Sequence, residues 1–306
     1  MATQSKYIWM DGRLVDFQNA TLNFLSPALH YGLGVFEGIR SYQTERGPAV
    51  FRLREHMQRL LNSAAVLGFR EVPYTLDQLI DAVRDTIRAN GFTACYIRPL
   101  VYLDGPIGSL SMDTGRAAVG IAAWEWGAYL GDAAREKGVR ANVSSFTRHH
   151  PNVMMTKAKV SGAYANSVLA KTESLRLGFD EAIMLDPQGY VAECTGENLF
   201  IVRGGKIFTP HTAPILEGIT RDALATLAHD LGYTVEPQPI SRDQLYIADE
   251  VFVCGTAAEV ISVTEVDFRV IGSGRMGPVT HQLQQAFHAA VSGNHPRSAE
   301  WLTYVD

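Results

Sequence analysis

Short runs of apolar residues separated by glycine-containing turns predict β-hairpins through much of the chain. Residues 7–10 form the first run, and residues 14–17 form a second run after the turn Asp11-Gly12. Asp-Gly between two apolar runs is a strong signal for a tight hairpin. The same pattern predicts strands over 35–52 around a polar turn at 44–48, at 94–103, 117–124, 139–143, 250–254 and 259–264, and hairpins around 186–189 and 204–205.

Apolar residues spaced three and four apart predict helices between these strands. The clearest helix covers about residues 54–67, with its apolar residues on one face and Gly68 at its end. Thr75 can cap the next helix because Gln78 follows three residues later, and Gly91 ends that helix. Further helices are predicted over 161–177, 221–231 and 279–292, with a short one starting at Ser241.

The order of these elements indicates the fold class. Strands and helices mix without a regular β-α-β alternation, which favours an α+β fold with mixed sheets and flanking helices over a doubly wound parallel sheet. The glycine-containing segment 126–131 is typical of a connector. We therefore expect a smaller N-terminal α/β domain over 1–125, a connector over 126–136 and a larger C-terminal domain over 137–306.

Composition and charge exclude several classes of protein. Hydrophobic residues make up 46% of the 306 residues, yet no window approaches the roughly 18 unbroken apolar residues of a membrane span. The first residues lack the pattern of a secretory signal. Lys and Arg number 27 against 32 Asp and Glu, without the basic stripe that a nucleic-acid partner requires. Three widely spaced cysteines favour a reducing cytoplasm, and the histidines show no spacing typical of a metal site.

One glycine motif suggests a nucleotide-binding fold but lacks its context. Residues 272–277 match the pattern G-x-G-x-x-G and precede a predicted helix. A dinucleotide site also needs a second strand that ends in an acidic residue about 20 positions later. Only 29 of the 306 residues follow Gly277, and those after the helix are typical of a loop. A plain glycine turn is therefore the preferred interpretation, with a nicotinamide enzyme as the alternative.

The segment around Lys157 and Lys159 is the first candidate for catalysis. Two lysines two residues apart would project to one face of an extended strand. A second cation and apolar neighbours lower the pKa of a lysine and favour the free amine that Schiff-base chemistry requires. The alternative is a pair of surface lysines at the junction of a strand and a helix.

Acidic residues between two apolar runs form a second candidate. Glu193, Glu197 and Asn198 lie within residues 191–202, which have the composition of buried strands. A buried acid needs a partner, and the protonated nitrogen of a pyridine ring is one possibility. Glu197 and Asn198 could instead bind backbone groups in a turn.

Two places are suited to an anion such as phosphate. Gly218-Ile219-Thr220 leads into a helix, where Thr220 could act as the cap and unpaired N–H groups favour an anion. The segment 254–258 ends a strand with small residues that could form an anion nest. Any capped helix or glycine turn has these features. Arg59 lies off the apolar face of its helix, so a solvated arginine is the default interpretation.

A short region rich in glycine, aromatic and charged residues suits a substrate pocket. Residues 29–40 combine these types within one stretch, and a tight loop packed on a hairpin is the alternative. Tyr96 and Arg98 would lie on one face of a predicted strand, where a phenol and a guanidinium could bind carboxylates.

Eight sequence strings occur in a fixed order along nearly the whole chain. They are HYGLGVFEGIR, YIRPL, WGAYLG, KAKVSGAY, EAIMLD, ECTGENLF, LEGITRDAL and ADEVFVCGTAAEV. In this respect the chain resembles the fold-type IV pyridoxal-phosphate enzymes, which have two domains of the D-amino acid aminotransferase type. It is most similar to the branched-chain amino acid aminotransferases. The resemblance implies transfer of an amino group from leucine, isoleucine or valine to 2-oxoglutarate, which gives a branched-chain 2-oxo acid and glutamate.

The resemblance also assigns residues to the cofactor, pyridoxal 5'-phosphate. Lys159 corresponds to the Schiff-base lysine, which also moves the proton in catalysis, and Lys157 has no counterpart. Glu193 corresponds to the partner of the pyridine nitrogen, and Tyr164 to the tyrosine beside the phenolic oxygen. The phosphate group would be bound by Arg59, Ile219, Thr220 and Thr256.

For the substrate, the resemblance implies an apolar pocket with two carboxylate sites. Tyr96 and the backbone of Ala257 and Ala258 correspond to the site for the α-carboxylate, and Arg98 to the site for the second carboxylate of glutamate. The walls correspond to Phe36, Trp126, Tyr129 and Tyr164, and a neighbouring subunit would lend Tyr31 and Leu110. This implies a homodimer at minimum, with a hexamer as the larger alternative. D-amino acid aminotransferases, (R)-amine transaminases and aminodeoxychorismate lyases are the rival activities in the superfamily.

Overall fold

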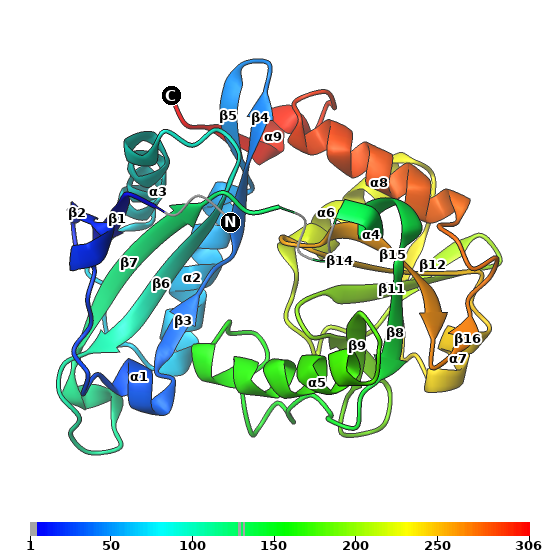
Figure 1. Cartoon of the computed structure of the whole chain (residues 1–306), viewed down its shortest axis with the longest axis horizontal. Helices are drawn as coiled ribbons and strands as arrows, with labels where there is room; N and C mark the ends of the chain where they lie inside the picture. The colour runs from blue at the N-terminus through cyan, green and yellow to red at the C-terminus, as the bar shows by residue number, and fades with distance from the viewer. Residues whose placement is uncertain (1–4, 128–129, 131) are drawn as a thin grey trace. The chain divides into compact units, whose positions relative to one another are not determined.

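The computed structural model describes residues 5–127, 130 and 132–306, which divide into two compact units (Figure 1). Unit 1 contains the chain up to residue 126 together with 157–163 and 290–306, and unit 2 contains 127–156 and 164–289. Each unit is therefore assembled from segments that are separated in sequence. The domain division expected from the sequence, with a connector over 126–136, stays a prediction.

Unit 1 is built on an antiparallel sheet. Among the described residues it has eight strands in the order β17-β5-β4-β6-β7-β1-β2, with β3 paired to β6. The hairpin at Asp11-Gly12 is confirmed, because Met10 pairs with Arg13 and both turn residues have positive φ. The strands are β1 (Tyr7–Met10), β2 (Arg13–Asp16), β3 (Gly34–Phe36), β4 (Ile39–Thr44), β5 (Gly47–Phe51), β6 (Cys95–Asp104), β7 (Arg116–Trp124) and β17 (Leu302–Tyr304).

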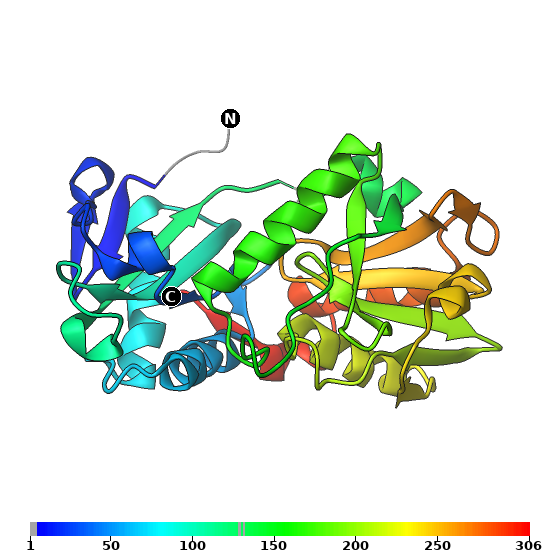
Figure 2. The same ribbon diagram turned by 90° about the horizontal axis from the view of Figure 1, so that it is seen from below.

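Two long helices pack against this sheet and against each other, α2 (Leu53–Leu67) and α3 (Leu76–Asn90) (Figure 2). Leu53, Met57, Leu60 and Ala64 on the apolar face of α2 are buried, as the periodicity predicts. In α3 the capping box between Thr75 and Gln78 is present, which confirms the predicted start of the helix. The short helices of this unit are η1 (Phe17–Asn19), α1 (Pro27–Tyr31), η2 (Met112–Thr114), η3 (Ser161–Ala163) and α9 (Ser298–Trp301).

Unit 2 is built on a mixed sheet of nine strands within the described residues, in the order β10-β9-β8-β15-β14-β11-β12-β13, with β16 paired to β15. Parallel pairs (β8 with β9, β8 with β15, β12 with β13) occur beside antiparallel hairpins. The two sheets confirm the predicted α+β class. The strands are β8 (Val139–Val143), β9 (Glu181–Leu185), β10 (Val191–Cys194), β11 (Asn198–Arg203), β12 (Lys206–Thr209), β13 (Val235–Pro237), β14 (Glu250–Gly255), β15 (Glu259–Val266) and β16 (Arg269–Val270).

Helices cover the sheet of unit 2, with α4 packed on β15, α5 on β9 and α6 on β14. Of the helices that the structure describes, none combines the length and the apolar character needed to cross a membrane.

The glycine motif at 272–277 forms turns that lead into α8, so the alternative of a dinucleotide fold is wrong. The helices are α4 (Asp132–Lys137), α5 (Tyr164–Arg176), α6 (Ile219–Asp230), α7 (Arg242–Tyr246) and α8 (Pro278–Val291), whose last two residues belong to unit 1.

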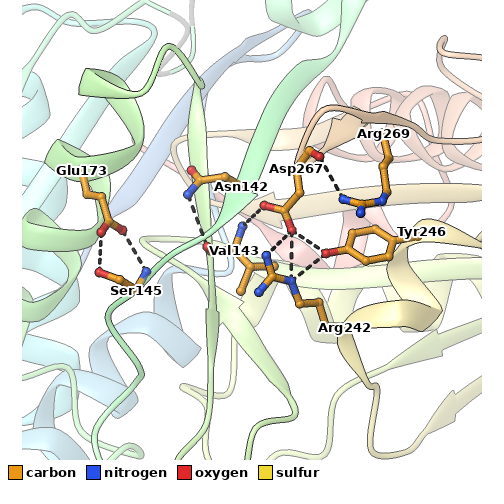
Figure 3. Close-up of polar contacts among 8 residues, drawn as sticks. All are labelled: Asn142, Val143, Ser145, Glu173, Arg242, Tyr246, Asp267 and Arg269. Atoms are coloured by element: carbon orange, nitrogen blue, oxygen red, sulfur yellow. Dashed lines mark hydrogen bonds and ion pairs between the residues drawn. The ribbon is translucent and has the colours of Figure 1, made fainter.

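Asp267 joins three elements of unit 2 (Figure 3). Its carboxylate accepts hydrogen bonds from the Val143 N–H of β8 at 2.9 Å and from the Arg242 and Tyr246 side chains of α7 at 2.6 to 3.1 Å. The φ of Asp267 is 50°, which an aspartate tolerates better than most residues. The turn between β15 and β16 is thereby bonded to both β8 and α7.

Candidate active site

Lys159 of unit 1 does not lie on a strand with Lys157, so that part of the sequence-based prediction is wrong. The chain turns at residues 156–158, which leaves Lys157 exposed and Lys159 half-buried. A turn removes the two-residue alternation that would place both side chains on one face. The two lysines therefore differ in exposure, although their spacing in the sequence gives no reason to distinguish them.

The backbone of Lys159 is bound on both sides within unit 1. Its N–H donates to the Ser63 hydroxyl of α2 at 3.0 Å, and its carbonyl accepts from the Phe36 N–H at 3.0 Å. Ser63 is fully buried, and Val160 forms a bridge with Val35 of β3. The Nζ of Lys159 lies 5.0 Å from the centre of the Phe36 ring. The position of this amine is therefore defined by contacts from α2 and β3.

Arg59 is not a solvated arginine, which corrects the interpretation made from the helix pattern alone. Its Nε and Nη2 donate to the two carboxylate oxygens of Glu37 at 2.6 and 2.8 Å. The Glu37 side chain is fully buried and also contacts the buried His56 ring at 2.7 Å. Burial by itself would raise the pKa of Glu37, but the charges and hydrogen bonds of Arg59 and His56 hold that pKa well below its usual range. This two-point pairing sets the plane of the guanidinium.

Three of the predicted substrate residues of unit 1, Tyr96, Arg98 and Trp126, lie together at β6. The Nη2 of Arg98 donates to the Tyr96 hydroxyl at 3.1 Å, and the Trp126 ring packs edge-on against Tyr96 at 4.5 Å. Tyr31 and Leu110 are exposed by 45% and 85%, on α1 and in the loop before η2. Tyr129 lies outside the described residues.

Glu193 of unit 2 is buried on β10 with defined partners for both oxygens. One oxygen is 2.9 Å from Nη2 of Arg148, and the other accepts from the Asn198 amide at 3.2 Å and from the Leu216 N–H at 3.3 Å. The segment containing Arg148 is tied to β9, because the Arg148 N–H donates to the Leu185 carbonyl. A guanidinium and two neutral donors stabilise the ionised form of this carboxylate.

The start of α6 differs from the sequence-based prediction. The helix begins at Ile219 with Gly218 as its N-cap, so Thr220 lies inside the first turn and is not the cap. A side chain at position 218 would place its Cβ 2.0 Å from Oδ1 of Asn198, so glycine is required there. Ile219 and Thr220 are buried, and their position in the first turn still suits an anion.

The remaining predicted residues of unit 2 begin or connect elements. Tyr164 is the first residue of α5. Thr256, Ala257 and Ala258 form the turn between β14 and β15. Gly255 before this turn approaches the backbone of Gly196, since an added Cβ would lie 3.1 Å from that carbonyl oxygen. Small residues at 256–258 keep this turn tight.

Glu197 bonds backbone in a turn, as one interpretation of the sequence predicted, and it has an unusual protonation. Its carboxylate accepts from the Gly196 N–H at 3.1 Å and is almost fully buried. Burial and the nearby charge of Glu181 raise its pKa from 4.5 to about 8. This shift favours the protonated acid in the folded protein under conditions that ionise the same group in the unfolded chain.

This difference predicts a pH-dependent stability. Because the folded state holds a proton that the unfolded chain releases above about pH 4.5, the free energy of unfolding should fall as pH rises toward 8. We expect Glu197→Gln to remove this fall and to be about 2 kcal/mol more stable than the parent at pH 8.5. Urea denaturation at pH 6 and pH 8.5 measures the effect. Parallel pH dependence in both proteins would contradict the assignment.

The described residues fit pyridoxal phosphate by the chemistry of their donors. Lys159 of unit 1 supplies an amine for an aldehyde, and Arg59 supplies a guanidinium for a phosphate group. In unit 2 the buried carboxylate of Glu193 suits a protonated ring nitrogen. The first turn of α6 and the turn at 256–258 provide backbone N–H groups and threonine hydroxyls that suit a phosphate.

Sequence reasoning missed the residues that support these groups. Glu37 binds Arg59, Ser63 binds the backbone of Lys159, and Arg148 binds Glu193. Asn198 was a candidate, but its hydrogen bond to Glu193 was not predicted. The sequence signal for Glu37 is a charged residue inside an apolar strand pattern, which requires a partner if it is buried. Nothing in the sequence identifies Ser63, because a serine on a helix is usually solvated.

Comparisons with known proteins agree with this donor set. The profile of the family described as amino-transferase class IV matches residues 34–266. A branched-chain-amino-acid aminotransferase of Pseudomonas aeruginosa is 48% identical over 305 residues, which cover 100% of this chain and 99% of the relative.

Two solved structures of a T.th. branched-chain amino acid aminotransferase are also similar. One contains pyridoxamine 5'-phosphate (TM-score 0.96, 50% identity) and the other N-(5'-phosphopyridoxyl)-L-glutamate (TM-score 0.95, 48% identity). Each alignment covers 99% of this chain and 100% of the solved one.

Proposed function

The chain belongs to the class IV amino-transferase family, and on that premise we propose that it transfers the amino group of leucine, isoleucine and valine to 2-oxoglutarate. It is a branched-chain-amino-acid aminotransferase that depends on pyridoxal phosphate. The observation that carries this conclusion is 48% identity over the full length of a relative with that activity. Support for 2-oxoglutarate comes from the glutamate adduct in a solved relative.

Lys159 is the proposed catalytic residue. When bound, pyridoxal phosphate supplies an aldehyde that takes the amino group and a ring that accepts the electron pair left at the substrate Cα. The Nζ of Lys159 would act as base and acid, removing a proton from Cα and returning one later in the reaction. The bonds from Ser63 and Phe36 to its backbone support this role, because they limit the positions that the amine can reach.

Glu193 would accept a hydrogen bond from the protonated ring nitrogen. Its ionised form suits that role, and Arg148 and Asn198 stabilise this form. Tyr164 would bind the phenolic oxygen of the cofactor. The proposed phosphate ligands are Arg59, Ile219, Thr220 and Thr256.

The substrate would be held by two kinds of contact. Tyr96 and the backbone of Ala257 and Ala258 would bind the α-carboxylate, and Arg98 would bind the second carboxylate of glutamate or 2-oxoglutarate. The proposed walls of the side-chain pocket are Phe36, Trp126, Tyr129 and Tyr164.

We also propose a homodimer as the smallest assembly, with a hexamer as the larger alternative. Exposure of Tyr31 and Leu110 supports this, since apolar side chains that are 45% and 85% exposed are suited to contact a second subunit. A cytoplasmic location is proposed because the three cysteines are buried free thiols. Small amino acids and 2-oxo acids are the proposed ligands, with no role for nucleic acid or membrane.

One comparative assay tests the proposed function. With 2-oxoglutarate as acceptor, we expect turnover of L-leucine, L-isoleucine and L-valine, and rates at least about 100-fold lower with D-alanine and (R)-1-phenylethylamine. Glutamate formation measures the rate, and the absorption spectrum of the purified protein before and after L-leucine is added reports the first half of the reaction. A preference for D-alanine or the amine would assign the chain to a rival activity.

A further inference from the structure

Three aromatic rings surround the guanidinium of Arg98 in unit 1. The Cζ of Arg98 lies 4.6 Å from the centre of the Phe36 ring, 5.3 Å from that of Tyr96 and 5.8 Å from that of Trp124. All three distances are within the range of cation–π attraction. We call Phe36, Tyr96 and Trp124 the ring cage.

Strand register explains why these residues meet. Tyr96 of β6 lies directly opposite Trp124 of β7, and Arg98 stands two residues further on the same face of β6. Phe36 of β3 lies opposite Leu100, which places its ring on that face as well. The register thus brings the whole ring cage to one side of the sheet.

Close packing maintains the arrangement. The Trp124 ring packs against Tyr96 at 5.0 Å, and the Tyr96 hydroxyl accepts from Arg98. A Cβ at Gly38 would lie 2.1 Å from the Tyr96 hydroxyl, so only glycine leaves room for this tyrosine. Trp124 therefore supports Arg98 directly and through Tyr96.

Ring faces, rather than a carboxylate, compensate the charge of Arg98. Its Nε is buried without a hydrogen-bond partner, and among the residues that the structure describes no acid forms an ion pair with it. A cation in apolar surroundings gains from an anionic ligand, and until one binds, ring faces are the main compensation. The same faces offer apolar contact to an aliphatic side chain.

We propose that Trp124 is a specificity-determining residue that positions Arg98 for the second carboxylate of a dicarboxylic substrate. Trp124 is not required for binding a substrate with an aliphatic side chain in that position, because a branched alkyl group makes no use of the positive charge of Arg98. This inference rests on the proposed function, since it assumes that Arg98 faces the side chain of the substrate.

Two inhibitors without a reactive group test the inference by binding alone. Glutarate carries two carboxylates, whereas 4-methylvalerate carries one carboxylate and the side chain of leucine. Calorimetry on the holoenzyme should show that Trp124→Leu weakens glutarate binding about tenfold and 4-methylvalerate binding less than about threefold. Trp124→Phe, which keeps a ring face, should recover most of the glutarate affinity.

A matched control separates specificity from general loss of packing. Trp9 of β1, in the same sheet as Trp124, also packs against a tyrosine, since the centre of its ring lies 5.0 Å from that of Tyr74. We expect Trp9→Leu to lower the thermal midpoint without changing the ratio of the two affinities. Equal weakening of both ligands by Trp124→Leu, or no change in either, would overturn the inference. If the parent holoenzyme binds neither ligand, the proposed function itself fails.

Discussion

Lys159→Ala is expected to have almost no transaminase activity, with kcat lowered about 10⁴-fold or more. The substitution removes the amine but leaves the bonds of the Lys159 backbone to Ser63 and Phe36 intact. The variant should therefore fold normally and still bind the cofactor through its phosphate and ring contacts. Glutamate formation from L-leucine and 2-oxoglutarate measures the loss, and the visible absorption band of the lysine-bound cofactor should disappear with it.

Lys157→Ala is the matched control for this prediction. Lys157 has the same charge and lies two residues earlier, but it is exposed where Lys159 is half-buried. We expect the transamination rate of the Lys157→Ala variant to stay within about twofold of the parent rate, because most surface substitutions have small effects. An active Lys159→Ala enzyme, or an equal loss in both variants, would remove Lys159 from the proposed role.

Glu37→Gln is expected to cause the second large effect, on both cofactor affinity and stability. The amide leaves the half-buried Arg59 and the buried His56 without the charge that now pairs with them, and breaking such a pair costs about 3 kcal/mol. Because Arg59 also loses its fixed plane, we expect the Kd of the apoprotein for pyridoxal phosphate to rise about 30-fold.

The comparison ligand in this experiment is pyridoxal, which lacks the phosphate. If Glu37 acts by orienting Arg59 toward phosphate, the affinity for pyridoxal should change less than about threefold. Glu55→Gln is the control. Glu55 lies on α2, the helix that carries Arg59, and it also pairs with an arginine, Arg52, but its side chain is 42% exposed. Its effect should stay below about 1 kcal/mol. Equal losses for both ligands in Glu37→Gln would show a general defect and contradict the assignment.

The two predictions have a common physical basis. Each proposed functional residue is held by a buried neighbour: the backbone of Lys159 by Ser63, the Arg59 side chain by Glu37, and the Glu193 side chain by Asn198. Functional geometry of this kind is maintained by surrounding hydrogen bonds. Removing a supporting residue should therefore change affinity or rate without removing the reacting group.

Local sequence patterns determined the elements of this fold well. The hairpin at Asp11-Gly12 and the capping box at Thr75 depend on interactions between residues close in sequence, so their signals are complete in a short window. The α+β class followed from the order of elements, and the ordered strings identified the family. The roles of the individual site residues stay proposals.

Only the tertiary structure decided what each charged residue contacts. Arg59 has the pattern of a solvated arginine, but β3 ends beside its helix and places the buried Glu37 against it. Lys157 and Lys159 are equivalent by spacing, and a turn at 156–158 makes one exposed and the other half-buried. Trp124 meets Arg98 because of the register between β6 and β7. The desolvation and pairing of a charge depend on distances between segments remote in sequence, which periodicity cannot encode.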